Sequence, residues 1–373
     1  MKKLISILVA FAMMATLAVT MAFAEGATGI KGTEAQPAKI NLTKTLKAPE
    51  GSNPASEFTF VITDLTEYAE GTAAEDKATI GAAKKATFAA DAEGTGSGLV
   101  TYTQTVEDVL GNVSFPAAGV YTLKVEEQNK GQTIPTTVDK VTTTIKYSNA
   151  SYVLKVGVAT KANGDRYVDA IALYDAANTN AKVDPATFGF ENELSQKIDN
   201  TTYDPQNPDT WDDALEIDKA VTGTNASTTQ LFSFKLSMNR PANVSEEQTY
   251  YYDIVGQDGT VLKDHQSITT GTPDETIQLK AGDRIVFEKI DVGASYILEE
   301  AKYPAWTSDL DMTDAAYINV AGNTQTVTNT YDETEDPATG LSMANLPFIV
   351  LALVAIGGLA AYVIVRRKSE DNA

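Results

Sequence analysis

Residues 57–63 read Glu-Phe-Thr-Phe-Val-Ile-Thr, and residues 231–238 read Leu-Phe-Ser-Phe-Lys-Leu-Ser-Met. In both stretches apolar residues alternate with polar ones, which is the pattern of a strand with one buried face. Similar stretches, bounded by Gly, Asn, Asp or Pro, recur at 120–125, 142–147 and 151–158. This spacing of short alternating stretches predicts an all-β protein built of β-sandwiches.

The two quoted stretches belong to two copies of one longer pattern. Ile-Asn-Leu-Thr-Lys at 40–44 precedes the first Phe-x-Phe strand, and Leu-Glu-Ile-Asp-Lys at 215–219 precedes the second. Each copy continues with a strand that ends in Glu-Glu and closes with a strand that contains Asn. These later strands lie at 119–127 and 187–192 in the first copy, and at 293–300 and 325–330 in the second. The longer interval from Glu to Asn in the first copy predicts additional strands or loops there.

The repeat predicts two tandem domains, at residues 25–198 and 199–332. Between the copies, residues 200–213 are polar and include two prolines, which is typical of a short and fairly stiff linker. Residues 25–37 have the composition of a loose N-terminus. An acidic stem leads out of the second domain into residues 333–340.

Strand parity places a lysine and a glutamate of each copy, and the asparagine of the first copy, on the apolar, inward face of the strand. The residues are Lys44, Glu127 and Asn192 in the first copy, and Lys219 and Glu300 in the second, where Asn329 has the matching place in the closing strand. Unpaired buried charge is very costly, so such groups pair or become neutral. A simpler alternative has each lysine reaching water from a strand end, with Glu and Asn just beyond the core. A register shifted by one residue would instead point Glu126 and Glu299 inward.

The two ends of the chain have the patterns of export and membrane insertion. Residues 1–24 combine two lysines, an apolar stretch and a final Ala-Phe-Ala, which predicts a signal peptide cleaved after Ala24. Residues 346–365 contain no charged residue and are long enough to cross a bilayer as a helix. The basic tail at 366–373 is expected to stay in the cytoplasm, so residues 25–345 face the outside. The alternative for residues 1–24 is an N-terminal membrane anchor, and the alternative for residues 346–365 is a buried core helix.

The segment Asp-Pro-Ala-Thr-Gly at 336–340 stands just before that apolar stretch. With the apolar span and the basic tail, it resembles the sorting signal of Gram-positive surface proteins, Leu-Pro-x-Thr-Gly, although Asp336 stands where that signal has Leu. The resemblance implies that a sortase cleaves between Thr339 and Gly340 and passes the Thr339 carbonyl to an amine. The membrane span would hold this peptide close to a membrane-bound enzyme.

With these motifs, the chain resembles the Gram-positive backbone pilins of the two-domain streptococcal type that contain isopeptide linkages. The resemblance implies two tandem Ig-like (CnaB-type) β-sandwiches. It also implies that Lys44 joins Asn192 with the help of Glu127, and that Lys219 joins Asn329 with the help of Glu300. Burial lowers the pKa of a lysine and raises that of a glutamate, so a neutral amine could attack the amide. A protonated Glu could polarise the Asn carbonyl and carry protons as ammonia leaves.

The family resemblance also implies how subunits assemble. Thr339 would be joined to a lysine of the next identical subunit, and Lys182, close to the last strand of the first domain, is the expected acceptor. The implied function is a structural subunit of a cell-wall fimbrium on a Gram-positive surface. The partners would be a sortase, identical subunits, ancillary pilins and host or surface ligands. The alternatives are a wall-anchored adhesin or ancillary pilin that is not polymerised, and a surface hydrolase, for which the sequence shows no cleft.

Composition excludes several other classes. The chain has no cysteine, so disulfides, thiolate zinc sites and cysteine nucleophiles are impossible. A single histidine, His265, leaves little scope for a catalytic triad. The net charge of −21 argues against a nucleic-acid partner. The acidic cluster at 309–314 lacks the Gly and the final Glu of a calcium loop, so we expect no metal there. Taken with the composition, this leads us to expect no cofactor and no enzyme activity beyond self-modification.

Overall fold

The structure is a computed structural model that describes residues 29–207, 214–272 and 275–332. These residues are nearly all-β, as the alternation predicts, and the described helices are short 3₁₀ turns at Ala74–Asp76 and Pro185–Thr187. No helix in the described ranges has the length and apolar character that a membrane span requires. The expected signal peptide (1–24), membrane helix (346–365) and basic tail (366–373) lie outside these ranges.

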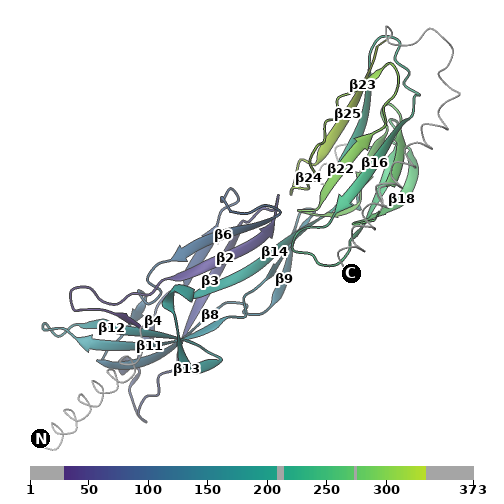
Figure 1. The fold of residues 1–373 in the computed structure, drawn as a ribbon. Coiled ribbons are helices and arrows are strands. Elements are labelled where there is room, and N and C mark those ends of the chain that lie inside the picture. The colour runs from purple at the N-terminus through teal and green to yellow at the C-terminus, as the bar shows by residue number, and fades with distance from the viewer. Residues whose placement is uncertain (1–28, 208–213, 273–274, 333–373) are drawn as a thin grey trace, which may run out of the picture. The chain divides into compact units, whose positions relative to one another are not determined.

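The chain divides into two compact units, Met1–Gln196 and Lys197–Ala373. In the first unit, one sheet has seven strands in the order β1-β12-β11-β8-β3-β5, with β13 also paired to β12 (Figure 1). Its strands are β1 Gly29–Lys31, β3 Ser56–Asp64, β5 Lys84–Phe88, β8 Gly119–Glu127, β11 Ser151–Thr160, β12 Arg166–Asp175 and β13 Asn178–Val183.

The second sheet of this unit has the order β6-β2-β14-β10-β9. Its strands are β2 Leu42–Pro49, β6 Leu99–Val106, β9 Thr133–Val138, β10 Val141–Lys146 and β14 Gly189–Asp199, and a separate pair joins β4 Thr79–Ile80 to β7 Val113–Ser114. Strands β9 to β13 lie between Glu127 and Asn192, where the longer interval predicts additional elements. The expectation of a loose N-terminus at 25–37 is wrong in part, because β1 lies within these residues and pairs with β12.

The second unit repeats this arrangement with fewer strands. One sheet has the order β18-β17-β20-β15-β25-β23, and the other has the order β19-β16-β22-β24. Their strands are β15 Glu216–Thr222, β16 Phe232–Asn239, β17 Thr249–Val255, β18 Val261–Thr269, β19 Glu275–Leu279, β20 Arg284–Phe287, β22 Ser295–Glu300, β23 Trp306–Ser308, β24 Ala316–Tyr317 and β25 Thr324–Tyr331. The last residues of β14, from Lys197 on, belong to this unit and pair with β21, Lys289–Asp291.

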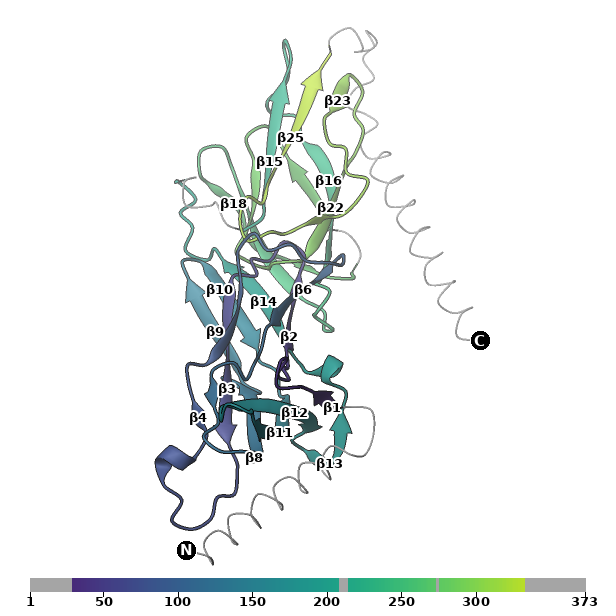
Figure 2. The same ribbon diagram turned by 90° about the vertical axis from the view of Figure 1, so that its left-hand side faces the viewer.

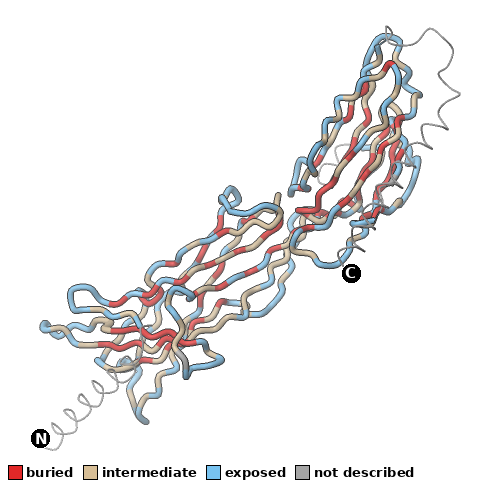
Figure 3. Tube along the Cα trace, viewed as in Figure 1, coloured by how far each residue is buried: buried red, intermediate tan, exposed pale blue. Residues whose placement is uncertain are grey.

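The core of each unit lies between its two sheets, because buried and exposed residues alternate along the strands (Figure 3). In the first unit, Phe60 of one sheet packs against Phe190 of the other, with ring centroids 5.2 Å apart. In the second unit, Phe232 packs in the same way against Trp306, at 5.1 Å. The Phe-x-Phe strands that open each repeat therefore supply the aromatic centre of each sandwich.

Candidate functional site: two buried Lys-Glu-Asn trios

The first and last strands of each repeat lie side by side and parallel, β2 with β14 and β15 with β25 (Figure 2). Lys44 is level with Phe190, so Asn192 stands two residues further along the neighbouring strand. Lys219 is level with Val327, so Asn329 has the same offset of two residues. Residues two apart share a face of the sheet, and both lysines therefore meet their asparagines across the same inward-facing diagonal.

In the first unit this diagonal is closed by Glu127 from the opposite sheet, and the three residues form the first trio. The exposed fractions of Lys44, Glu127 and Asn192 are 0%, 2% and 0%. Lys44 Nζ lies 3.0 Å from Glu127 Oε1 and 3.3 Å from Oε2, and Asn192 Nδ2 donates to Glu127 Oε1 at 2.9 Å. One carboxyl group thus contacts both the amine and the amide nitrogen.

The second trio has the same members in a different hydrogen-bond pattern. Lys219 and Asn329 are each 2% exposed, and Lys219 Nζ donates to Asn329 Oδ1 at 2.7 Å. The same amine also donates to the backbone carbonyls of Ala220, at 2.7 Å, and Val327, at 3.0 Å. Glu300 is half-buried and accepts a hydrogen bond from the Ser308 hydroxyl.

Two phenylalanines of the Phe-x-Phe strand support each trio. Lys44 Nζ lies 4.2 Å from the centroid of the Phe58 ring, and Lys219 Nζ lies 4.6 Å from that of Phe232. The second phenylalanine of each strand is paired with the glutamate: Phe60 with Glu127, and Phe234 with Glu300. The first phenylalanine follows the lysine at nearly the same interval in both repeats, 58 − 44 = 14 residues in the first and 232 − 219 = 13 residues in the second.

Burial shifts the pKa values of the lysine and the glutamate in each trio in the direction that favours their neutral forms. Loss of hydration lowers the pKa of Lys44 from 10.5 to about 8, against the opposing effect of Glu127. The same cause lowers the pKa of Lys219 to about 8. Burial also raises the pKa of Glu127 and that of Glu300 above the usual value for glutamate. In each site burial therefore makes the neutral amine and the protonated carboxyl group easier to reach than they are in water.

Glu126 and Glu299, which precede Glu127 and Glu300, lie on the outward face of their strands. Glu126 pairs with Lys124 at 2.7 Å and with Lys130 at 2.8 Å, and its hydrogen bonds to these lysines lower its pKa to about 2. Glu299 is exposed. Strand parity therefore selects Glu127 and Glu300 as the inward carboxyl groups, and the alternative register is wrong.

Two serines near the trios were not identified from the sequence. The Ser148 backbone N–H donates to Asn192 Oδ1 at 2.8 Å, so this carbonyl oxygen faces the backbone and the amide nitrogen faces Glu127. The expected contact of Glu with the Asn carbonyl is therefore replaced, in the first trio, by a contact with the amide nitrogen. Ser308 and Ser148 lie in or just after β23 and β10, which flank the terminal strands but do not repeat in sequence.

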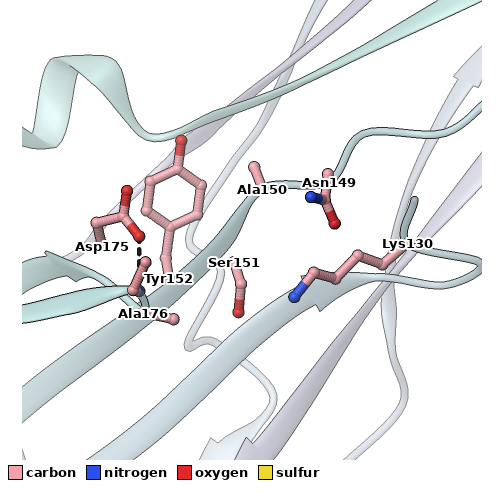
Figure 4. Close-up of a pocket in the computed structure, with 8 residues that line it drawn as sticks. Lys130, Asn149, Ala150, Ser151, Tyr152, Asp175 and Ala176 are labelled. Atoms are coloured by element: carbon pink, nitrogen blue, oxygen red, sulfur yellow. Dashed lines mark hydrogen bonds between the residues drawn. The ribbon is translucent and has the colours of Figure 1, made fainter.

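The expected acceptor, Lys182, is half-buried on β13 opposite Tyr174 of β12. A polar pocket lies on the same sheet, at the ends of β11 and β12 (Figure 4). There Lys130 Nζ and the Ser151 hydroxyl both donate to Glu126 Oε1, at 2.8 and 3.0 Å. The expected cleavage site, Thr339 and Gly340, lies outside the described residues. Within the described ranges no group of three or more His, Cys, Asp or Glu side chains could hold a metal ion.

Comparisons with known proteins find a similar family for part of each unit. Residues 40–195 match the family described as Spy0128-like isopeptide containing domain. Residues 213–335 match a family described as a domain of unknown function, DUF7601. The chain is 26% identical over 347 residues to a protein named pilin from Streptococcus pyogenes serotype M1, which covers 87% of this chain and 90% of that protein.

Solved structures of similar proteins include the major pilin of Streptococcus pyogenes. It is 21% identical, the match covers 79% of this chain and 99% of that chain, and the TM-score is 0.32. The T3.2 major pilin of the same species is 17% identical over 82% of this chain and 100% of that chain, with a TM-score of 0.32. Residues 40–195 are therefore similar to the family of Spy0128-like isopeptide containing domains.

Proposed function

We propose that this protein is a structural subunit of a sortase-assembled pilus, stabilised by one Lys–Asn isopeptide bond in each domain. The observation that carries the proposal is the repetition of the buried trio, with the same two-residue offset between parallel terminal strands. The match to a streptococcal pilin over most of the chain supports the same function. One accidental buried lysine would be unremarkable, but two equivalent ones beside a Glu and an Asn favour a shared reaction.

The chemistry in the first domain follows from the contacts of Glu127. Neutral Lys44 Nζ attacks Asn192 Cγ, while the Ser148 N–H stabilises the charge that develops on Oδ1. Protonated Glu127 gives its proton to Nδ2 and takes one from Nζ, since it contacts both nitrogens. The Nζ–Cγ bond forms, the Cγ–Nδ2 bond breaks and ammonia leaves. Folding supplies the proximity, so a single slow turnover is enough.

The product would tie β2 to β14 in the first domain and β15 to β25 in the second. The bond closes a loop of 192 − 44 = 148 residues in the first domain and of 110 residues in the second. A cross-link around loops of this size contributes about 5 kcal/mol in the chain-entropy model. Tension applied at the two ends of a domain would pass through the amide, and the residues inside the loop would carry none of it. This property suits the shaft of a fibre.

Intact mass spectrometry of residues 25–332 tests the two bonds. We expect a mass about 34 Da below the sequence value, because each amide-forming elimination releases one ammonia. Glu127→Ala and Glu300→Ala should each restore about 17 Da, half of that deficit. A wild-type chain of unmodified mass would show that the trios are only structural.

Assembly is tested in cells that carry the sortase. We infer that Thr339 is joined to Lys182 of the next subunit, on a Gram-positive cell surface. The wild type should give a ladder of high-mass species that survives hot SDS, and Lys182→Arg or Thr339→Ala should abolish it. Lys130→Arg is the matched control and should leave the ladder unchanged, because it replaces another lysine of the same domain and keeps the positive charge. A single wall-released band in the wild type would favour an adhesin or ancillary pilin that is not polymerised.

A further inference from the structure

The two trios differ in how the glutamate is held. Glu127 is 2% exposed and is fixed by direct contacts with Lys44 and Asn192. Glu300 is only half-buried, and the three oxygens that accept from Lys219 belong to Ala220, Val327 and Asn329. The second glutamate therefore lacks the amine contact that anchors the first.

A pocket beside the second trio increases the need for an anchor. Glu300 and Asn329 both line it, together with Tyr303, Trp306 and Ser308. A carboxyl group at the edge of a pocket gains hydration by rotating outward. Such a rotation would take Glu300 away from the amide on which it must act.

Ser308 is placed to prevent this rotation. It is paired with Asn329 across β23 and β25, and its hydroxyl donates to Glu300 Oε2. The Leu310 backbone N–H donates to Ser308 Oγ at 3.2 Å. Because that bond occupies an acceptor position of the hydroxyl, the hydroxyl proton is directed at the carboxyl group.

The other oxygen of Glu300 is the chemically available one. Glu300 Oε1 is buried and makes no hydrogen bond of full geometry to a residue in the described ranges, but Asn329 lies close enough for hydrogen bonding to lower the Glu300 pKa. A buried polar atom without a hydrogen bond of full geometry is uncommon and requires an explanation. Here the explanation is a group held ready to exchange a proton with Asn329 during the reaction.

We propose that Ser308 is a positioning residue for bond formation in the second domain, where it holds Glu300 by one oxygen so that the other serves Asn329. This inference rests on the proposed isopeptide chemistry. The first domain needs no such hydroxyl, because Glu127 is enclosed and the Ser148 backbone N–H holds Asn192. The two sandwiches thus use the serine beside the terminal strand in different ways.

The test compares Ser308→Ala, Ser308→Thr and Thr307→Ala in residues 25–332, which contain all the described strands of both units. Each chain is made by cell-free translation, captured in denaturant before it folds, and refolded at several pH values from about 5 to 10. Proteolysis and mass spectrometry then follow two cross-linked peptides, Lys44–Asn192 and Lys219–Asn329. The first-domain peptide is an internal control in every sample.

Ser308→Ala should slow formation of the Lys219–Asn329 bond by roughly tenfold or more, the effect of losing one hydrogen bond to a half-buried carboxyl group. The Lys44–Asn192 bond should form at its wild-type rate. Loss of the donor destabilises the carboxylate, so the limb of the second domain's pH–rate profile that reports the titration of Glu300 should move to higher pH. Ser308→Thr should restore the rate, and Thr307→Ala, on the exposed face of the same strand, should leave it unchanged.

A wild-type rate in Ser308→Ala would overturn the inference and leave the proposed function intact. Slow bonding at every pH without a shift of the profile, not rescued by Ser308→Thr, would assign Ser308 a merely structural role and also overturn it. Circular dichroism of each refolded chain identifies a variant that fails to fold, in which case the Ser308→Thr comparison decides. Absence of both cross-linked peptides from the wild type would instead refute the proposed function.

Discussion

Asn192→Ala should measure what the first isopeptide bond contributes to stability. The variant cannot form the bond, but it keeps the contact of 3.0 Å between Lys44 and Glu127. Loss of the cross-link around the 148-residue loop (192 − 44) costs about 5 kcal/mol. For a unit of this size, each kcal/mol lowers the Tm by about 2–4 °C, so the bond alone accounts for about 10–20 °C. The Ser148 N–H also loses its acceptor, which adds about 1–3 kcal/mol.

Gln196→Ala is the matched control for that second loss. Gln196 lies on the same strand, is 6% exposed, and hydrogen-bonds Asn53 and Thr143 through its amide. Its truncation removes a buried amide but no cross-link, so the Tm should fall by only the few degrees that those hydrogen bonds are worth. Scanning calorimetry gives the Tm of each variant, and intact mass confirms which bonds are present. Equal Tm losses in the two variants would refute the covalent interpretation.

Three further predictions concern the same bonds. In Asn192→Ala, Lys44 keeps a free amine, whose pKa is about 8 in the folded chain and 10.5 in the unfolded chain. The unfolded chain therefore binds more protons between these two pH values, and the free energy of unfolding should rise with pH there, by at most about 3 kcal/mol. Denaturant melts of the wild type, whose Lys44 is an amide, should lack this rise. Glu300→Ala should regain about 17 Da, the mass of one ammonia, whereas Glu299→Ala, which changes an exposed side chain, should keep the full deficit. Under force, Asn192→Ala should release about 500 Å of chain from the first domain that the wild type retains, a length readable by single-molecule pulling.

Much of the fold and both trios could be predicted because strand parity is a strong constraint. A one-residue error would have turned Lys44 outward among exposed side chains, yet its apolar neighbours leave only one face for it. The repeat supplied a second, independent register, and Lys219 obeyed the same rule. The longer interval before Asn192 also predicted the additional strands β9 to β13.

The details that could not be predicted depend on non-local pairing. Ser148 and Ser308 reach the trios only because β10 and β23 lie beside the terminal strands, and neither segment repeats in sequence. The orientation of the Asn192 amide depends on one backbone N–H from that neighbouring segment. The strand β1 has three residues, too few for any alternation to be recognised.

The geometry of the trios explains why such a bond would lock only the native fold. Lys44 and Asn192 meet across a diagonal between parallel strands, which the long lysine stem can span. A slip of the pairing by one residue would send one of the two side chains to the outer face. Glu127 comes from the opposite sheet, so the sandwich must also close before a proton can be transferred. Register, closure and dehydration are therefore all required before the amine can react, and a misfolded chain meets none of these conditions together.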